Sequence, residues 1–471
     1  MKKLIGDKKF YKMVLAVAVP IMIQNGITNF VSLLDNVMVG LVGTEQMSGV
    51  AIVNQLIFVY NLCIFGAVSG AGIFTAQFAG QKNHKGVRDT FRFKILVCGI
   101  ATLLAIVIFV LFGKELINLY LHEGGETGDI AVTLQSGENY LWIMLIGLFP
   151  FTVVQAYAST LRETGETMVP MRAGIVAVFV NLVLNYILIF GKLGAPVLGA
   201  SGAAIATVIS RFVECAIVMR WTHRHTDRNP FIVGALRSLK MSVNLAKKIS
   251  FKGLPLLVNE TLWGLGTAML MQSYSVRGLA VVAGLNISST ISNIFNIAFI
   301  ALGNSVAIVV GQLLGAGKMR EAKETAYKMI FFSTAVCLVT GGAMVALSPL
   351  FPRIYNTNSE VRYLATWFII ITACLMPIQG FLHASYFTIR SGGKTFVTFL
   401  FDSVFMWVVS IPLAYGLTRY TNYNILPIYF ICQFIDIIKC MIGFILVKKG
   451  VWLQNIVEDR KEPLNADSSM E

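Results

Sequence analysis

Residues 95–113 read ILVCGIATLLAIVIFVLFG, a run of 19 residues without a charged side chain. An apolar helix of about 20 residues crosses the hydrocarbon core of a bilayer, whereas a strand of a membrane barrel alternates polar and apolar residues. This stretch therefore predicts a transmembrane helix over about 93–113.

Similar apolar runs recur along the whole chain and are all too long for buried strands. They predict an all-α integral membrane protein with twelve transmembrane helices. The other expected helices cover 13–38, 46–79, 137–160, 169–190, 199–220, 250–274, 280–314, 326–350, 361–388, 396–417 and 424–447.

The composition supports this interpretation. Of 471 residues, 56% are hydrophobic and 13% are charged, about half the charged share of a soluble globular protein. Disordered and collagen-like chains are excluded by the same values. The 7 cysteines all lie in apolar runs, so we interpret them as small hydrophobic residues and expect no metal cofactor.

The basic residues behind the net charge of +14 are distributed as the expected topology requires. With both termini in the cytoplasm, 30 of the 38 Lys and Arg residues fall on the cytoplasmic side and 6 on the opposite side, as the positive-inside rule requires. We therefore expect a multi-pass protein of the plasma (inner) membrane with both termini cytoplasmic. The lipid bilayer is its expected partner, and nucleic acid is not.

The chain divides into two similar halves. Constant offsets of 235 or 228 relate the pairs Pro20 and Pro255, Gln77 and Gln312, Gly80 and Gly315, Arg162 and Arg390, and Gly165 and Gly393. Two parallel six-helix repeats predict two pseudo-symmetric lobes around a central cleft. We expect an N-terminal lobe over 1–222, a basic cytoplasmic linker over 223–249, a C-terminal lobe over 250–450 and a cytoplasmic tail over 451–471.

Other functional classes fit less well. The triplet Gly393-Lys394-Thr395 suggests a phosphate loop, but Thr388 stands where the motif requires a glycine. The 5 histidines are scattered, so no enzyme site is indicated. A channel has little use for a two-half repeat. Secondary transport by alternating access, without a bound cofactor, is the remaining class.

Charged residues inside membrane spans are functional candidates, because each costs about 2.5–3.5 kcal/mol to insert. Arg211 with Glu214 and Asp436 with Lys439 have the spacing of ion pairs, which favours a structural role. Three further carboxyls have no basic residue within a helical turn: Asp35, Glu260 and Asp402. Asp35 could alternatively be solvated at the interface, and the other two could be hydrogen-bonded core groups.

Two asparagines in the 169–190 run also stand out. Asn181 and Asn185 are four residues apart, so both amides project from one helix face. They could bond to other helices or coordinate a cation. Thr207 follows a cluster of small residues in the 199–220 run that allows close helix packing, and its hydroxyl could bond its own helix or reach the same site.

At these positions the sequence resembles the multidrug and toxic compound extrusion (MATE) family. The likeness covers about residues 10–450 and is strong through the order and spacing of its motifs. They are DNVMVG at 35–40, RETGETMVP at 162–170, NLVLNYILIFG at 181–191, GASGAAIAT at 199–207 and GQLLGAG at 311–317.

The resemblance implies two lobes that form a V-shaped cleft, and export of cationic amphiphilic drugs in exchange for inward Na⁺ or H⁺. It implies a cation-coupling site at Asp35, Asn181, Asn185 and Thr207, which would also hold Na⁺. Some family members carry aspartate where Asn185 stands, so the coupling ion stays open. Glu260 follows Pro255 more closely than the corresponding family glutamate does.

We expect the substrate cleft to carry acidic and aromatic residues that attract organic cations, namely Glu260, Asp402, Trp263 and Tyr274. Asp402 is included because a charged residue inside a membrane span is costly to insert, and not because of the family resemblance. The alternatives are a lipid or oligosaccharide-lipid flippase of the same wider superfamily, and a sensor without transport. We expect a monomer.

Overall fold

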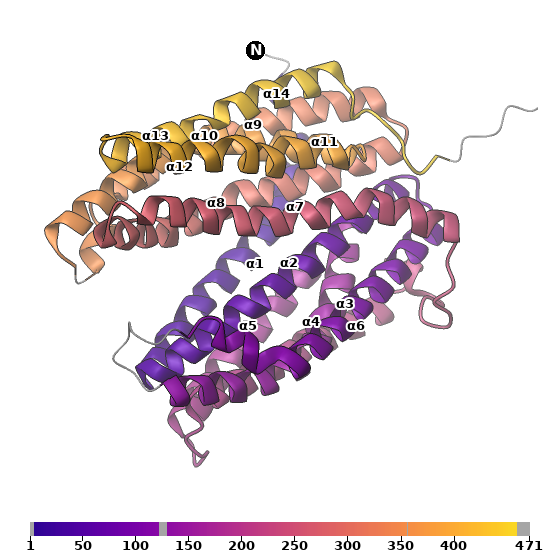
Figure 1. Cartoon of the computed structure of the whole chain (residues 1–471). Coiled ribbons are helices and arrows are strands. Elements are labelled where there is room, and N and C mark those ends of the chain that lie inside the picture. The colour runs from indigo at the N-terminus through magenta and orange to yellow at the C-terminus, as the bar shows by residue number, and fades with distance from the viewer. Residues whose placement is uncertain (1–3, 122–129, 356, 459–471) are drawn as a thin grey trace, which may run out of the picture.

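The computed structural model describes residues 4–121, 130–355 and 357–458. All regular elements in these ranges are helices, and they form two bundles, one from each half of the chain (Figure 1). The all-α, two-lobe architecture predicted from the sequence is confirmed.

The N-terminal lobe contains six long helices. Their bounds are α1 Lys8–Gly40, α2 Thr44–Gly80, α3 His84–Asn118, α4 Ile130–Thr164, α5 Met168–Phe190 and α6 Gly199–Arg224. The short 3₁₀ turn η1, Pro230–Ile232, lies in the linker that follows.

The C-terminal lobe repeats this plan with more interruptions. It contains α7 Val243–Ser275, α8 Leu279–Gly315, α9 Met319–Leu347, η2 Phe351–Ile354 and α10 Ser359–Ser391. One further span consists of α11 Thr395–Phe399, the π-helical turns η3 Leu400–Val404 and η4 Met406–Ser410, and α12 Ile411–Tyr420. The last span consists of α13 Ile425–Phe434 and α14 Asp436–Lys449.

Eleven helical segments in the described ranges are long and apolar enough to cross a membrane. The twelfth expected span, α7, has 33 residues and is therefore long enough, but it carries Lys247, Lys248, Lys252 and Glu260. Helices also continue beyond the predicted spans. The apolar run at 93–113 lies inside α3, since a helix extends into polar turns outside the hydrocarbon core. Both helices that flank the predicted linker reach into it, because α6 ends at Arg224 and α7 begins at Val243.

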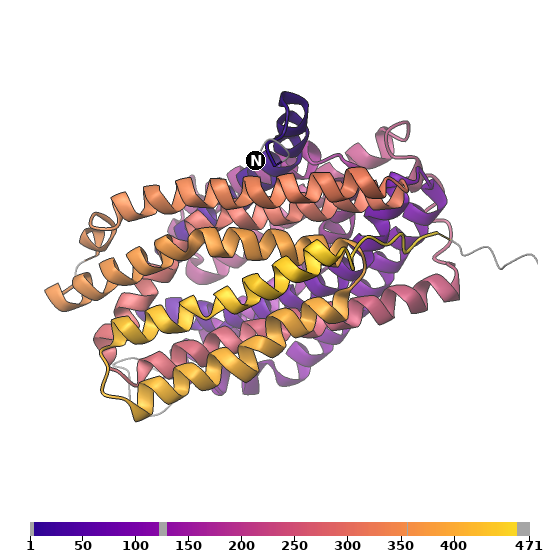
Figure 2. The ribbon, with the colours of Figure 1, turned by 90° about the horizontal axis from the view of Figure 1, so that it is seen from above.

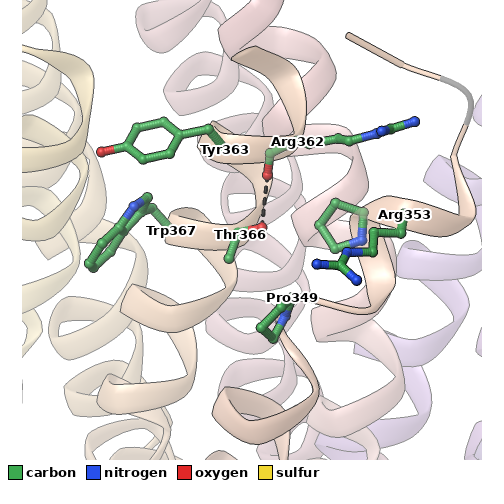
Figure 3. A pocket seen from close by; sticks show the side chains of 7 residues that line it. Pro349, Arg353, Arg362, Tyr363, Thr366 and Trp367 are labelled. Atoms are coloured by element: carbon green, nitrogen blue, oxygen red, sulfur yellow. Dashed lines mark hydrogen bonds between the residues drawn. The ribbon is translucent and has the colours of Figure 1, made fainter. Parts of the chain in front are cut away.

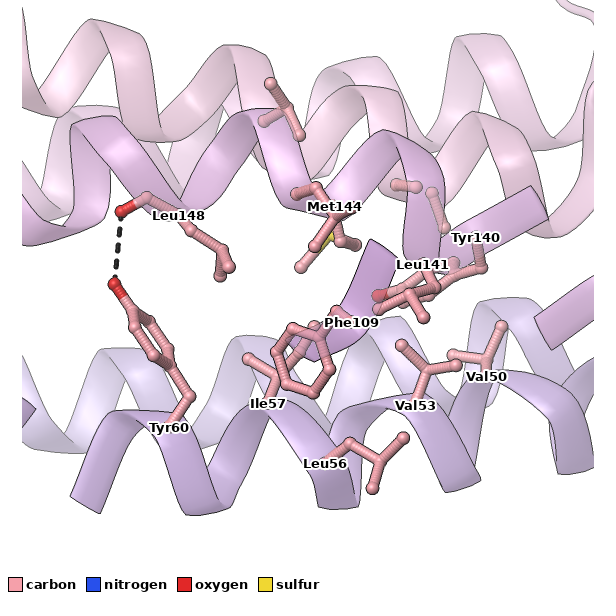
Figure 4. Packing of buried hydrophobic residues seen from close by; sticks show 14 of the residues in the cluster. Val50, Val53, Leu56, Ile57, Tyr60, Phe109, Tyr140, Leu141, Met144 and Leu148 are labelled. Carbon is pink, nitrogen blue, oxygen red and sulfur yellow. Dashed lines mark hydrogen bonds between the residues drawn. The ribbon is translucent and has the colours of Figure 1, made fainter. Parts of the chain in front are cut away.

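Each lobe has its own apolar core. In the N-terminal lobe, α2 and α4 face one another across Val53, Ile57, Met144 and Leu148 (Figure 4). The hydroxyl of Tyr60 donates to the Leu148 carbonyl at 3.4 Å, which satisfies a polar group inside this core.

The lobes exchange the starts of two helices. Phe10, Val14 and Ala18 of α1 pack in a cluster with residues of α8, α9 and α10. In the other direction, Ile249 of α7 packs with Phe74 and other residues of the N-terminal lobe. The first turns of α1 and α7 therefore belong, by their contacts, to the lobe opposite to their own.

One end of the molecule carries the linker, the ends of α2, α4, α8 and α10, and the segment Gly450–Glu458 after α14. We call it the basic end. Figures 1 and 2 show the linker and the C-terminal segment at this same end. Arg88 binds the linker to α3 through the carbonyl of Phe231 at 3.1 Å, and Lys252 of α7 donates to the Gly393 carbonyl at 2.8 Å.

Candidate functional site

Three helices of the N-terminal lobe bring the four predicted coupling residues together. The Asn185 amide of α5 donates to the Asp35 carboxylate of α1 at 2.5 Å and to Oδ1 of Asn181 at 3.1 Å. The Asn181 amide donates in turn to the hydroxyl of Thr207 on α6 at 3.3 Å. The four residues thus form one continuous chain of hydrogen bonds.

This chain leaves one oxygen unused. Oδ1 of Asn185 is buried and accepts no hydrogen bond, although the residue itself is fully buried. A buried polar atom without a partner is costly and needs an explanation. No Lys or Arg in the described ranges lies within 4 Å of Asp35, so the carboxylate has only neutral donors around it.

The C-terminal lobe holds a different polar cluster. The Lys439 ammonium lies 3.1 Å from Asp436, which confirms the predicted ion pair, and 3.9 Å from Asp402. The Asn259 amide donates to Asp402 at 3.0 Å, and the Gln379 amide donates to Asp436 at 2.9 Å. Asp402 therefore lies inside the C-terminal lobe with a cationic partner, which its distance of 37 residues from Lys439 had hidden.

Asp402 occupies the first of the two π-helical turns. Such turns are rare, and they occur frequently at functional sites. Asn259 of α7 also accepts hydrogen bonds from the backbone amide of Ser403 at 3.3 Å and from its hydroxyl at 2.7 Å. The irregular backbone is thereby fastened to α7.

The remaining substrate residues expected from the sequence are scattered. Glu260 interacts electrostatically with Arg390. Trp263 is 41% exposed, whereas Tyr274 is buried in the C-terminal lobe with its ring centroid 5.6 Å from that of Tyr429. Eleven positions are about three helical turns, so the two aromatic residues lie near the same face of α7 and differ in their position along the helix.

A cavity of about 410 Å³ lies between the lobes. Neither Glu260, Asp402, Trp263 nor Tyr274 lines it. Its charged lining residues are Arg162, Glu163 and Glu214 from the N-terminal lobe and Arg390 from the C-terminal lobe. The expected acidic cleft thus carries both signs of charge, because the two arginines related by the repeat converge on it.

A family model described as MatE matches residues 20–187 and 255–416, well over half of the chain. The chain belongs to the MATE family. It is therefore a multi-pass protein of a membrane transporter family, whose members act on small molecules within a lipid bilayer.

Curated relatives of this MATE protein match along nearly their whole length. It is 26% identical to the probable multidrug resistance protein NorM of Thermotoga maritima over 459 residues, which are 96% of this chain and 95% of the relative. It is 24% identical to the probable multidrug resistance protein NorM of Bacillus subtilis, over 90% of this chain and 92% of the relative.

Solved structures show the same fold. A MATE transporter of Vibrio cholerae superposes with a TM-score of 0.84 at 17% identity, over 95% of this chain and 98% of that one. An outward-facing multidrug resistance MATE transporter superposes with a TM-score of 0.81 at 18% identity, over 95% of this chain and 97% of that one.

The MATE protein also contains a buried ion pair that the sequence did not reveal. Lys94 of α3 is fully buried and pairs with Glu163 of α4, and it donates to the hydroxyls of Ser159 and Thr160 at 3.1 Å each. By contrast, the predicted Arg211–Glu214 pair does not form, because Arg211 donates to the Gly147 carbonyl at 3.2 Å and lies over the ring of Phe151 at 5.1 Å.

A second cavity of about 400 Å³ lies far from these groups, on the C-terminal lobe. Pro349 and Arg353 border it on one side, and Arg362, Tyr363 and Trp367 of α10 border it on the other (Figure 3). It involves one lobe only, and so it does not share the inter-lobe position of the first cavity.

Proposed function

We propose that the protein is a secondary active antiporter that exports cationic amphiphilic compounds in exchange for inward Na⁺ or H⁺. Membership of the MATE family and the multidrug resistance names of its relatives support export of xenobiotics. They do not favour the flippase alternative. We further propose that the protein acts as a monomer and is not an enzyme.

The observation that carries ion coupling is the geometry around Asp35. A hard monovalent cation prefers several oxygen ligands and one compensating negative charge. The carboxylate of Asp35, the amide oxygens of Asn181 and Asn185 and the hydroxyl of Thr207 form such a set, and Oδ1 of Asn185 is already without a donor. A proton binding to Asp35 would neutralise the same charge, so the two ions compete.

The cavity between the lobes is the proposed substrate site. Its volume lies within the range of about 300–1,000 Å³ that is usual for small-molecule sites. Its lining combines apolar side chains such as Phe65 and Phe387 with the carboxylates of Glu163 and Glu214. Lys94 compensates Glu163, which leaves Glu214 as the carboxylate that we propose for attraction of a cationic group.

We propose that the basic end faces the cytoplasm in the plasma membrane. The distribution of 30 basic residues against 6 supports this orientation. A cysteine at Gly234 in the linker should then react only with reagents that reach the cytoplasm, and a cysteine at the exposed Leu193 only with reagents outside the cell. The reverse pattern would contradict the orientation.

Dye efflux from reconstituted vesicles tests the function, with Na⁺ and pH gradients imposed separately. At least one gradient should drive export of a cationic dye, and collapse of that gradient by an ionophore should stop it. Faster movement of an anionic dye, or of a labelled lipid without any gradient, would favour a flippase.

A further inference from the structure

The contact between the lobes at the basic end follows the internal repeat. Gln77 near the end of α2 donates to the Ser391 carbonyl of α10 at 2.9 Å. Gln312, its counterpart on α8, donates to the Glu163 carbonyl of α4 at 2.7 Å. Because Ser391 and Glu163 are themselves separated by the repeat offset of 228, the two bonds are pseudo-symmetric equivalents that each join one lobe to the other.

Two glycines allow this contact. A Cβ on Gly80 would collide with the backbone carbonyl of Gln312, and a Cβ on Gly315 would collide with that of Gln77. The helix ends of α2 and α8 therefore touch backbone to backbone. A close approach of this kind forms only when the lobes are together at the basic end.

The C-terminal segment breaks the symmetry. We call residues Trp452–Val457 the strap. Gln77 accepts a hydrogen bond from the backbone amide of Ile456 at 2.8 Å and donates to the Gln454 carbonyl at 3.2 Å. Asn455 donates to the Gly315 carbonyl at 3.3 Å. Gln77, which is fully buried, thus binds the strap as well as α10, whereas the side chain of Gln312 makes one hydrogen bond within the described part of the chain.

The two ends of the strap are anchored in different lobes. Trp452 is fully buried in the apolar cluster that contains α8, α9 and α10 residues. Ile456 and Val457 pack against the N-terminal cluster around Phe74 and Phe91. Phe231 and Ile232 of the linker, which stand 225 positions before these two residues, pack on that same cluster. The linker segment thus stays on its own lobe, and the strap crosses to the other.

From this geometry we infer that Gln77 and the strap form an inter-lobe latch that holds the cavity closed at the basic end, and that must release before the cavity opens there. The inference rests on the proposed alternating-access function. Gln312 supplies a weaker counterpart of the latch from the opposite lobe.

Release of the latch should make the contact between α2 and α8 accessible to a reagent from solution. Ala76 is buried on α2, and its Cβ lies 3.0 Å from the position of a Cβ on Gly311 of α8. A membrane-impermeant thiol reagent applied at the basic face of inside-out vesicles should reach an Ala76→Cys side chain only when the latch is open. The same chain without this substitution gives the background from the native cysteines.

Two truncations form a matched pair. Ending the chain after Leu453 removes the strap contacts to Gln77, whereas ending it after Glu458 leaves them in place. A neutral hydrogen bond shifts an equilibrium by roughly 2- to 10-fold, so the first truncation should speed labelling at least about tenfold over the full chain. The second should leave the rate unchanged. Equal rates for the two truncations would overturn the latch.

Substitutions in the full-length chain provide an independent test if the shorter chain does not fold. Gln77→Leu removes three bonds and Gln312→Leu removes one. Labelling should be several-fold faster in the first variant than in the second, and equal rates would again overturn the proposal. Labelling requires no export, so a protein that moves no dye in any gradient would disprove the proposed function while this result still decides the latch.

Discussion

Asp35 in the N-terminal lobe and the aspartates of the C-terminal polar cluster differ in their partners. In the N-terminal lobe, the amide of Asn185 is the donor to Asp35 among the described residues. In the C-terminal lobe, Asp402 and Asp436 share the ammonium of Lys439 as well as accepting amide donors. Lys439 is 4% exposed, so this cation is part of the protein interior.

The C-terminal cluster thus contains its own cation, Lys439, whereas the site around Asp35 contains none among the described residues. A buried charge is tolerated when it is paired, and an unpaired one must be neutralised by a proton or an ion from outside. Asp35 is therefore the group that we propose for coupling, although both lobes follow one structural plan. Four changes test this contrast.

The largest effect is expected from Asp35→Asn. Because the change removes the only charge of the four-residue chain, ion-driven dye export should be abolished while the protein remains folded and inserted. Efflux under each gradient and the thermal midpoint Tm should be measured, with Asp227→Asn in the exposed linker as the control. Normal export by Asp35→Asn would contradict the coupling site and make Glu260 the next candidate.

Lys439→Gln should weaken the C-terminal lobe. Removing one partner of a buried pair leaves uncompensated charge and costs about 3–5 kcal/mol. The free energy of unfolding should fall accordingly in detergent. In an Asp35→Asn background, Na⁺ should raise Tm only when Lys439 is also replaced, since the ion can then enter the vacated cluster. A loss below about 1 kcal/mol would show that Lys439 is not the internal cation.

Asn185→Asp should change the ion that drives export. Its carboxylate would lie where the amide now stands, 2.5 Å from Asp35. Two adjacent carboxylates hold a shared proton strongly, so the ratio of H⁺-driven to Na⁺-driven efflux should rise. In the wild-type protein, Na⁺ dependence should weaken as pH falls, because protons compete for Asp35. An unchanged ratio of H⁺-driven to Na⁺-driven efflux in the variant would show that Asn185 takes no part in ion coupling.

The smallest effect is expected from Thr207→Ala. This change removes one neutral oxygen, which should raise the Na⁺ concentration for half-maximal efflux by roughly 2- to 10-fold without loss of the maximal rate. Thr340→Ala is the matched control, because among the described residues the Thr340 hydroxyl bonds to Val336 and Cys337 of its own helix in the C-terminal lobe. Equal shifts in both variants would exclude a specific role for Thr207.

The fold and the N-terminal site could be predicted because their signals are local. Apolar length gives the spans, and the four-residue spacing places Asn181 and Asn185 on one face of α5. The family resemblance then connected them with Asp35 and Thr207 on other helices. The structure brings all four together, and their role in coupling stays a prediction.

The inter-lobe cavity could not be predicted in the same way. Lys94 and Glu163 are 69 residues apart, one at the start of the expected span 93–113 and the other beyond the end of the span 137–160, so nothing local relates them. Their burial arises from packing of α3 against α4. Arg390 lines the cavity because α10 meets the opposite lobe, and only the offset to Arg162 could have indicated that these arginines converge.

The exchange of helix starts between the lobes has a consequence for biosynthesis. Phe10, Val14 and Ala18 leave the ribosome first, but their packing partners on α8 and α9 follow more than half a chain later. At about 5–20 residues per second, the start of α1 waits roughly 15–60 s for its neighbours. The strap follows α14 in the chain, so the contact between the lobes is completed only after the helices of both lobes have been made.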